Sequence, residues 1–125
     1  MRYFVLLCLL ISSSALAQDL EFIDLSNDGT ISYLDRSSVK ISKNETSAWL
    51  LVDYSRVKKK KEHTAKILMS FRCNDQTYSV DYYISYATNV ENISAETPTF
   101  PSYDPVVPGS RSATVLKMIC QNQSN

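Results

Sequence analysis

The chain contains a single histidine, His63, so a search for catalytic chemistry starts there. A Ser-His-Asp site would need this imidazole to be buried and oriented by a carboxylate. The neighbouring Glu62 is adjacent in sequence, and on a strand its side chain would point to the opposite side. We therefore interpret His63 as a solvated residue at the start of a strand, and we predict no catalytic residue.

Metal and phosphate sites are not indicated by the sequence either. A metal ion needs three or four convergent ligands, and a calcium loop needs carboxylates at fixed spacing. Four aspartates are instead scattered over expected turns and strands: Asp24, Asp28, Asp35 and Asp53. The chain has only two glycines, which excludes a glycine-rich phosphate loop. The sequence thus predicts no metal, no cofactor and no enzymatic activity.

A run of four lysines, Lys58 to Lys61, follows Arg56 closely and is the strongest local charge in the chain. On a hairpin tip these cations would project together and could hold a sulfated glycan, an anionic lipid headgroup or an acidic protein patch. The same run is also typical of a solvated tip that keeps a hairpin soluble. Both interpretations stay open, because Glu62 dilutes the patch and salt screens it beyond ~8 Å.

Tyrosines are concentrated in one expected strand, and tyrosine suits interfaces because it offers a stiff contact area with a polar tip. Alternation predicts one face of core-type residues, comprising Tyr78, Val80, Tyr82, Ile84 and Tyr86. Tyr83 would then lie alone on the other face, which makes it the exposed candidate for binding. The alternative is that the whole set forms the core and its flank.

The first seventeen residues have the three parts of a secretory signal. Arg2 gives the positive start, residues 3–11 are an unbroken apolar run, and Ala15-Leu16-Ala17 offers a cleavage site before Gln18. The run is about half of the ~20 residues that a spanning helix needs. Cys8 lacks the preceding small residue of a lipid-attachment site. We expect residues 1–17 to be a signal peptide and 18–125 to be a single exported domain, periplasmic or secreted, without a lipid anchor.

Cleavage changes both the charge and the cysteine count. Without Arg2, 12 basic residues face 13 acidic ones, so no strong field attracts nucleic acid or anionic lipid. No second apolar stretch is long enough to span a membrane. Cys8 leaves with the signal, and an even pair in an exported chain, Cys73 and Cys120, predicts a disulfide. Two free buried thiols are the alternative.

Alternation and turn residues predict a series of strands at 20–25, 30–34, 38–42, 47–56, 63–73 and 78–86. Residues 27–29 read Asn-Asp-Gly, a strong hairpin turn. The 47–56 segment is apolar on both faces, as expected for a central strand. Residues 89–105 hold three of the four prolines and show no periodicity, so we expect a long loop there.

The chain is expected to close with a helix over 111–122, capped by Ser110. Its apolar stripe would consist of Ala113, Leu116, Ile119 and Cys120. Cys120 would then meet Cys73 on the inner face of the 63–73 strand and clamp helix to sheet. The predicted fold class is α+β, a single antiparallel meander packed against one C-terminal helix.

An ordered set of short motifs resembles the surface-adhesin protein E family of small exported Gram-negative bacterial domains. The set comprises Tyr33-Leu34-Asp35, Ser37-Ser38-Val39, the segment 48–55 (AWLLVDYS), Cys73, and Pro108-Gly109-Ser110 ten residues before Cys120. The likeness runs from about Leu20 to Cys120. It implies about six antiparallel strands on a C-terminal helix, and an adhesin that binds host matrix or serum proteins.

Together these observations predict an exported, non-enzymatic binding domain that acts through its sheet surface and loops. Its expected partner is a protein, either a host matrix or serum protein at the cell surface or an envelope protein. The missing lipid-attachment cysteine keeps a second hypothesis open, a periplasmic accessory or inhibitor protein. An anionic glycan at Lys58 to Lys61 is a further candidate, a dimer is possible, and no nucleic acid partner is expected.

Overall fold

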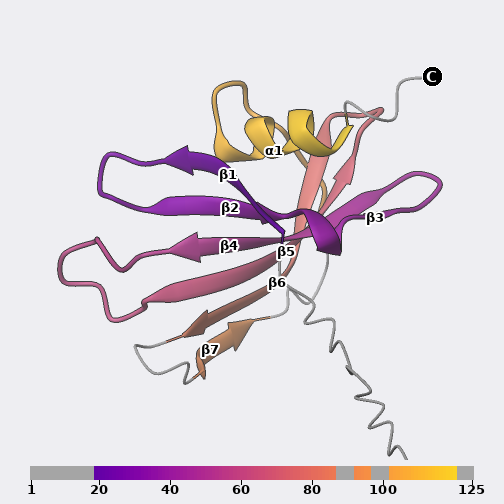
Figure 1. Cartoon of the computed structure of the whole chain (residues 1–125). Helices are drawn as coiled ribbons and strands as arrows, with labels where there is room; N and C mark the ends of the chain where they lie inside the picture. Colours follow the sequence, from indigo (N-terminus) through magenta and orange to yellow (C-terminus); the bar gives the residue numbers. More distant parts are fainter. Residues whose placement is uncertain (1–18, 87–91, 97–101, 121–125) are drawn as a thin grey trace, which may run out of the picture.

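One antiparallel sheet and one helix make up the part of the chain that the computed structural model describes, residues 19–86, 92–96 and 102–120 (Figure 1). The helix, α1 (Arg111–Cys120), lies across one face of the sheet. None of the described helices is long and apolar enough to cross a membrane. Residues 1–17 lie outside the described ranges, so the signal peptide stays a prediction.

Six strands follow one another across the sheet in the order β1-β2-β4-β5-β6-β7. Their bounds are β1 (Leu20–Leu25), β2 (Ile31–Asp35), β4 (Thr46–Asp53), β5 (Thr64–Arg72), β6 (Thr77–Tyr86) and β7 (Asn92–Glu96). Two short strands lie off this path: β3 (Lys40–Ile41) pairs with β4, and β8 (Asp104–Pro105) pairs with β6. A single 3-10 turn, η1 (Arg36–Ser38), joins β2 to β3. The predicted α+β meander is confirmed.

The expected turn at 27–29 joins β1 to β2. Gly29 has a φ of +96°, a conformation that residues with a Cβ rarely adopt. A Cβ at this position would also lie 3.3 Å from the Cβ of Arg56, in the loop between β4 and β5. The amide of Thr30 donates a 2.9 Å hydrogen bond to the Asp28 carboxylate. Glycine is therefore needed for both the backbone turn and the approach of the neighbouring loop.

The expectation of a long loop over 89–105 is wrong at residues 92–96 and 104–105, while residues 89–91 and 97–101 lie outside the described ranges. Residues 92–96 form β7, which pairs with the end of β6, and residues 104–105 form β8, which pairs with its beginning. Among the described strands, each of them pairs with β6 alone, so both are edge strands. Such strands need no apolar periodicity, and an edge tolerates Pro105, so the sequence pattern did not reveal them.

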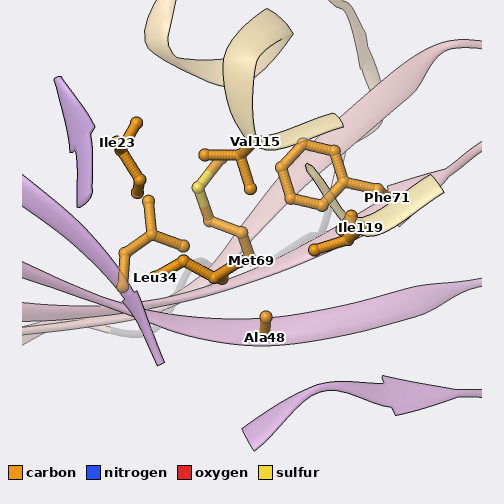
Figure 2. Packing of buried hydrophobic residues seen from close by; sticks show 8 residues of the cluster. Ile23, Leu34, Ala48, Met69, Phe71, Val115 and Ile119 are labelled. Carbon is orange, nitrogen blue, oxygen red and sulfur yellow. The ribbon is translucent and has the colours of Figure 1, made fainter. Parts of the chain in front are cut away.

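The core lies between α1 and the sheet (Figure 2). Leu34, Leu50, Phe71 and Val115 are all less than 2% exposed. They pack together with four further buried residues: Ile23, Ala48, Met69 and Ile119. The alternation predicted for β4 and β5 is confirmed, because Ala48, Leu50, Met69 and Phe71 all point toward the helix.

The buried stripe of α1 differs from the predicted one. Val115 and Ile119 are the buried residues of the helix, whereas Ala113 and Leu116 are only half-buried. Val115 was missed because the predicted stripe was placed about one position away around the helix. Ser110 caps the helix as predicted, since its hydroxyl accepts a 3.2 Å hydrogen bond from the amide of Ala113.

Three links besides the core attach α1 to the rest of the fold. Cys73 and Cys120 form the predicted disulfide, with their Cα atoms 5.8 Å apart. Arg36 forms an ion pair with Glu21 and donates a 3.0 Å hydrogen bond to the Met118 carbonyl. At the other end of the helix, Arg111 lies 3.4 Å from the Asp24 carboxylate. The helix is therefore held at both ends.

Candidate functional site

The sheet face away from α1 has no described helix packed on it (Figure 1). Cross-strand partners share a face, so the register of the strands identifies its members. Tyr33 pairs with Leu51, Trp49 pairs with Leu68, and Leu68 pairs with Tyr82. We call this surface the open face and assign to it Phe22, Leu25, Tyr33, Trp49, Leu51, Leu68, Tyr82 and Ile84.

Aromatic side chains make up half of the residues assigned to the open face. Phe22 and Tyr33 form an edge-to-face pair with ring centroids 6.4 Å apart, and Trp49 and Tyr82 form another at 6.1 Å. Phe22 is 57% exposed and Leu25 is 59% exposed. An exposed apolar surface of this kind is typical of an interaction site. The sequence analysis noted the apolar residues of β4 on both faces but did not predict this continuous surface.

A β-bulge in β6 overturns the predicted arrangement of the tyrosines. Leu68 pairs with Tyr82 while the next residue, Met69, pairs with Val80, which leaves Asp81 as an extra residue. An extra residue shifts the alternation by one, so the side chains after it exchange faces. The prediction that Tyr78, Val80, Tyr82, Ile84 and Tyr86 share one face is therefore wrong.

After the bulge, Tyr82 joins Trp49 on the open face, and Tyr83 pairs with Ile67 on the side of α1. Tyr83 is half-buried rather than an isolated exposed residue, so the reason for proposing it as a binding residue no longer holds. The Asp81 carboxylate accepts hydrogen bonds from the hydroxyls of Ser70 and Ser79. These bonds satisfy the extra residue within the sheet. An aspartate inside a tyrosine-rich strand was the available sign of the bulge, since aspartate disfavours regular strands.

The predicted basic tip lies in the loop between β4 and β5. The structure places Arg56 and Lys58 to Lys61 on this loop, and all five residues are exposed. Lys59 adopts a φ of +66°, and the Lys60 ammonium lies 3.6 Å from the centroid of the Tyr54 ring. The five cations are therefore brought together at one end of the sheet, as expected for either a binding site or a solvated tip.

Two aspartates flank the basic tip and partly offset its charge. The hydrogen bond from the Thr30 amide, helped by the Lys60 charge, lowers the pKa of Asp28. Burial acts to raise the pKa of Asp53, but hydrogen bonds from Ser55 and the nearby Arg56 charge outweigh it and lower the pKa overall. Both carboxylates stay ionised beside the cations, so the tip is less positive than its lysine count alone suggests.

His63 lies beside this loop and is half-buried. Its amide donates to the Tyr86 carbonyl and its carbonyl accepts from the Tyr54 amide, both at 2.8 Å, so its backbone continues the sheet. Within the described ranges, its ring makes no hydrogen bond to a serine or a carboxylate. Nor do His, Cys, Asp and Glu side chains there form a group of three or more that could hold a metal ion.

Comparisons with known proteins agree with this fold. A search for related curated proteins found no match. Crystal form II and the selenomethionine form of Haemophilus influenzae protein E each superpose with a TM-score of 0.55 at 14% identity, covering 86% of this chain and 94% of that one. A third structure of the same protein gives the same TM-score and identity and is covered to 91%. At this identity the structural likeness shows the fold alone. The sequence itself matches the family model described as surface-adhesin protein E over residues 21–121, so the chain belongs to the surface-adhesin protein E family.

Proposed function

We propose that this protein is an exported, non-enzymatic binding domain that docks a partner protein on its open face. Family membership makes it an adhesin-like protein. The observation that carries the proposal is the continuous set of aromatic and aliphatic side chains on the open face, with Phe22 more than half exposed. Aromatic residues are enriched at the centres of protein interfaces, where they contribute most of the binding energy.

The proposed partner is a folded host protein of the extracellular matrix or serum that presents an apolar patch of its own. Phe22, Leu25 and Tyr33 lie near the β1 edge of the face, and Trp49, Leu68 and Tyr82 lie at its centre. Two described open-face positions in this central region carry a charge: Lys66, which pairs with Ile84, and Asp81, whose carboxylate accepts hydrogen bonds from Ser70 and Ser79. A partner with a large charged patch would therefore lose solvation here without gaining matched ion pairs.

Phe22→Arg is the variant that tests the open face, with Ile41→Arg as its matched control. Both residues are large apolar residues on strands, and their exposure is similar, at 57% for Phe22 and 65% for Ile41. Ile41 pairs with Thr46, which lies on the helix side of the sheet, so the control changes the other face. Surface plasmon resonance against a panel of matrix and serum proteins should show at least tenfold weaker binding for Phe22→Arg alone.

The sequence has one tryptophan, Trp49, and it lies in the middle of the proposed interface. Docking of a partner that removes water from the open face should shift its fluorescence emission to shorter wavelength. A tryptophan-free fragment or peptide of the partner would make the signal specific. Binding with unchanged Trp49 emission, together with equal affinity of the two arginine variants, would place the interface elsewhere and refute the proposal.

Location decides between the two kinds of partner. Protease treatment of intact cells should degrade a surface-associated protein and spare a periplasmic one. Recovery of all the protein in the periplasmic fraction would exclude the host-protein partner. The open face would then serve an envelope protein, as the accessory or inhibitor hypothesis states.

The basic tip supports a second, separable interaction with a sulfated glycan. Its five exposed cations project from one loop, which favours contact with a flexible polyanion. Replacing Lys58 to Lys61 by serine should abolish retention on heparin while binding through the open face stays unchanged. Weak or absent retention of the wild type at physiological salt would show that the lysines only solvate the loop.

A further inference from the structure

A polar cavity of about 580 Å³ lies at the end of the sheet opposite to the basic tip. The turn between β3 and β4, residues 42–45, forms one wall, and Arg72, Asn74 and Asp75 from the β5 end and the following turn form the other. Both turns lie at the far end of β4 and β5 from the lysine loop (Figure 1). Every residue that lines the cavity is polar or charged.

Arg72 is held in one position at the edge of this cavity. Its guanidinium carbon lies 3.5 Å from the centroid of the Tyr103 ring, and its Nε lies 3.7 Å from Oε1 of Glu45. The Tyr103 hydroxyl donates a hydrogen bond to the same Glu45 oxygen. The three side chains come from three separate segments and fix one another, so little rotamer freedom remains to be lost when a ligand binds.

The hydrogen-bonding capacity of Arg72 is only partly used. In the described ranges its Nε faces Glu45, and the structure shows no partner for its two terminal nitrogens. A planar guanidinium with two free terminal nitrogens matches the two oxygens of a carboxylate. Lys43, which is exposed on the opposite wall, supplies a second cation. These two groups favour a carboxylate in the cavity.

The remaining lining groups restrict the rest of the ligand. Glu45 and Asp75 balance the two cations, which disfavours a ligand with several negative charges. The side-chain amides of Asn44 and Asn74 can both donate and accept hydrogen bonds, as hydroxyl and acetamido groups require. A cavity of this size falls within the usual range for small-molecule sites. A hydroxyl-rich body with one carboxylate fits these constraints.

We infer that this cavity is a binding site for a carboxylate-bearing sugar, with Arg72 and Lys43 on the carboxylate and the two asparagines on its hydroxyl or acetamido groups. The site lies at the end of the sheet, apart from the aromatic centre of the open face. It is therefore independent of the docking of a partner protein proposed above.

The test is a titration of the oxidised, mature protein followed by two-dimensional amide NMR. N-Acetylneuraminic acid and glucuronic acid should shift the amides of residues 42–45 and 72–75 with saturable, millimolar affinity. N-Acetylglucosamine, which has no carboxylate, and acetate, which has no hydroxyls, should each bind at least tenfold more weakly. Equal shifts with either of these controls, or no saturable shift with the acidic sugars, would overturn the inference.

Variants separate binding from stability. Arg72→Lys keeps the charge and loses the two-pronged geometry, so the dissociation constant should rise at least tenfold. Because Arg72 also holds Tyr103, Lys43→Ser provides a second variant on an exposed turn that leaves this contact intact. It should weaken acidic-sugar binding severalfold with an unchanged melting temperature. Lys60→Ser, at the other end of the sheet, should change nothing, and loss of binding in this control would also overturn the inference.

Discussion

Removal of the disulfide is the change whose effect can be worked out most directly from the fold. Cys73 and Cys120 are 47 residues apart, and the bond between them closes a loop of that length in the unfolded chain. Loop-closure entropy for such a loop amounts to about 4 kcal/mol at room temperature. A domain of this size is typically stable by ~5–15 kcal/mol. We therefore expect Cys73→Ala/Cys120→Ala to lose about 4 kcal/mol and to remain folded.

The variant should stay native because the helix has other attachments. Val115 and Ile119 are buried against the sheet, Arg36 binds the Met118 carbonyl, and Arg111 lies beside Asp24. The main loss should consequently come from a less restricted unfolded state rather than from a detached helix. Amides in the helix should exchange with solvent only at rates set by global unfolding.

Guanidinium denaturation followed by Trp49 fluorescence measures the free energy of unfolding of wild type and variant. Reduced wild-type protein is the matched control and should resemble the variant. A loss below ~1 kcal/mol would contradict the loop-entropy reasoning. Rapid exchange of the helix amides in an otherwise protected sheet would contradict the second step, because the disulfide would then be what holds the helix in place.

Three further outcomes follow from individual contacts. Phe71→Ala should lower the free energy of unfolding by about 4 kcal/mol, because this ring is fully buried. Urea denaturation measures this loss, and a loss under ~1 kcal/mol would contradict the packing of Phe71 in the core. Ser110→Ala should cost about 1 kcal/mol by removing the hydroxyl that accepts from the Ala113 amide, whereas Ser110→Thr should keep most of the stability. The pKa of Asp28 is lowered in the folded state, so its stabilising contribution is present above its unfolded pKa of 3.8 and is lost as pH falls through the lower folded value. Asp28→Asn should therefore flatten the acid limb of a stability profile recorded between about pH 5 and pH 2, and an unchanged limb would show that the Thr30 bond is unimportant.

The strands with regular alternation could be predicted from the sequence. In β5, Ala65, Met69 and Phe71 are buried two or four residues apart, so the period-two pattern identified both the strand and its inner face. The same pattern placed Cys73 on the side from which it reaches Cys120. Here local alternation and tertiary packing agree, which is why the sheet, the helix and their covalent link were all found.

The prediction from alternation is wrong in β6, where one extra residue shifts the alternating pattern of the side chains. Asp81 adds a single residue to β6, and every side chain beyond it points to the opposite face from the predicted one. A sequence pattern contains no marker of a bulge other than an unfavourable residue such as this aspartate. The assignment of Tyr82 and Tyr83 was wrong for that reason, and with it the choice of Tyr83 as the exposed candidate.

The candidate sites differ in how far they depend on tertiary structure. The basic tip is a continuous segment, so its five cations could be named from the sequence alone. The open face collects residues from five strands, and the cavity beside Arg72 lies between two turns about thirty residues apart. Tyr103, from a third segment, packs against Arg72. Surfaces of this kind are determined by register and topology, which single-strand patterns do not contain.

The size of the helix explains why the open face exists. Ten residues of α-helix are ~15 Å long, whereas a sheet of six neighbouring strands is ~24 Å wide between its outermost backbones. One such helix can cover part of a single face, and the fold uses it to bury Leu34, Leu50 and Phe71. A sheet that was only solvated on its other face would be expected to alternate with polar residues there. Instead, Trp49, Leu51 and Leu68 occupy those positions. These apolar residues favour a second surface that covers the open face, and we propose that a partner protein provides it.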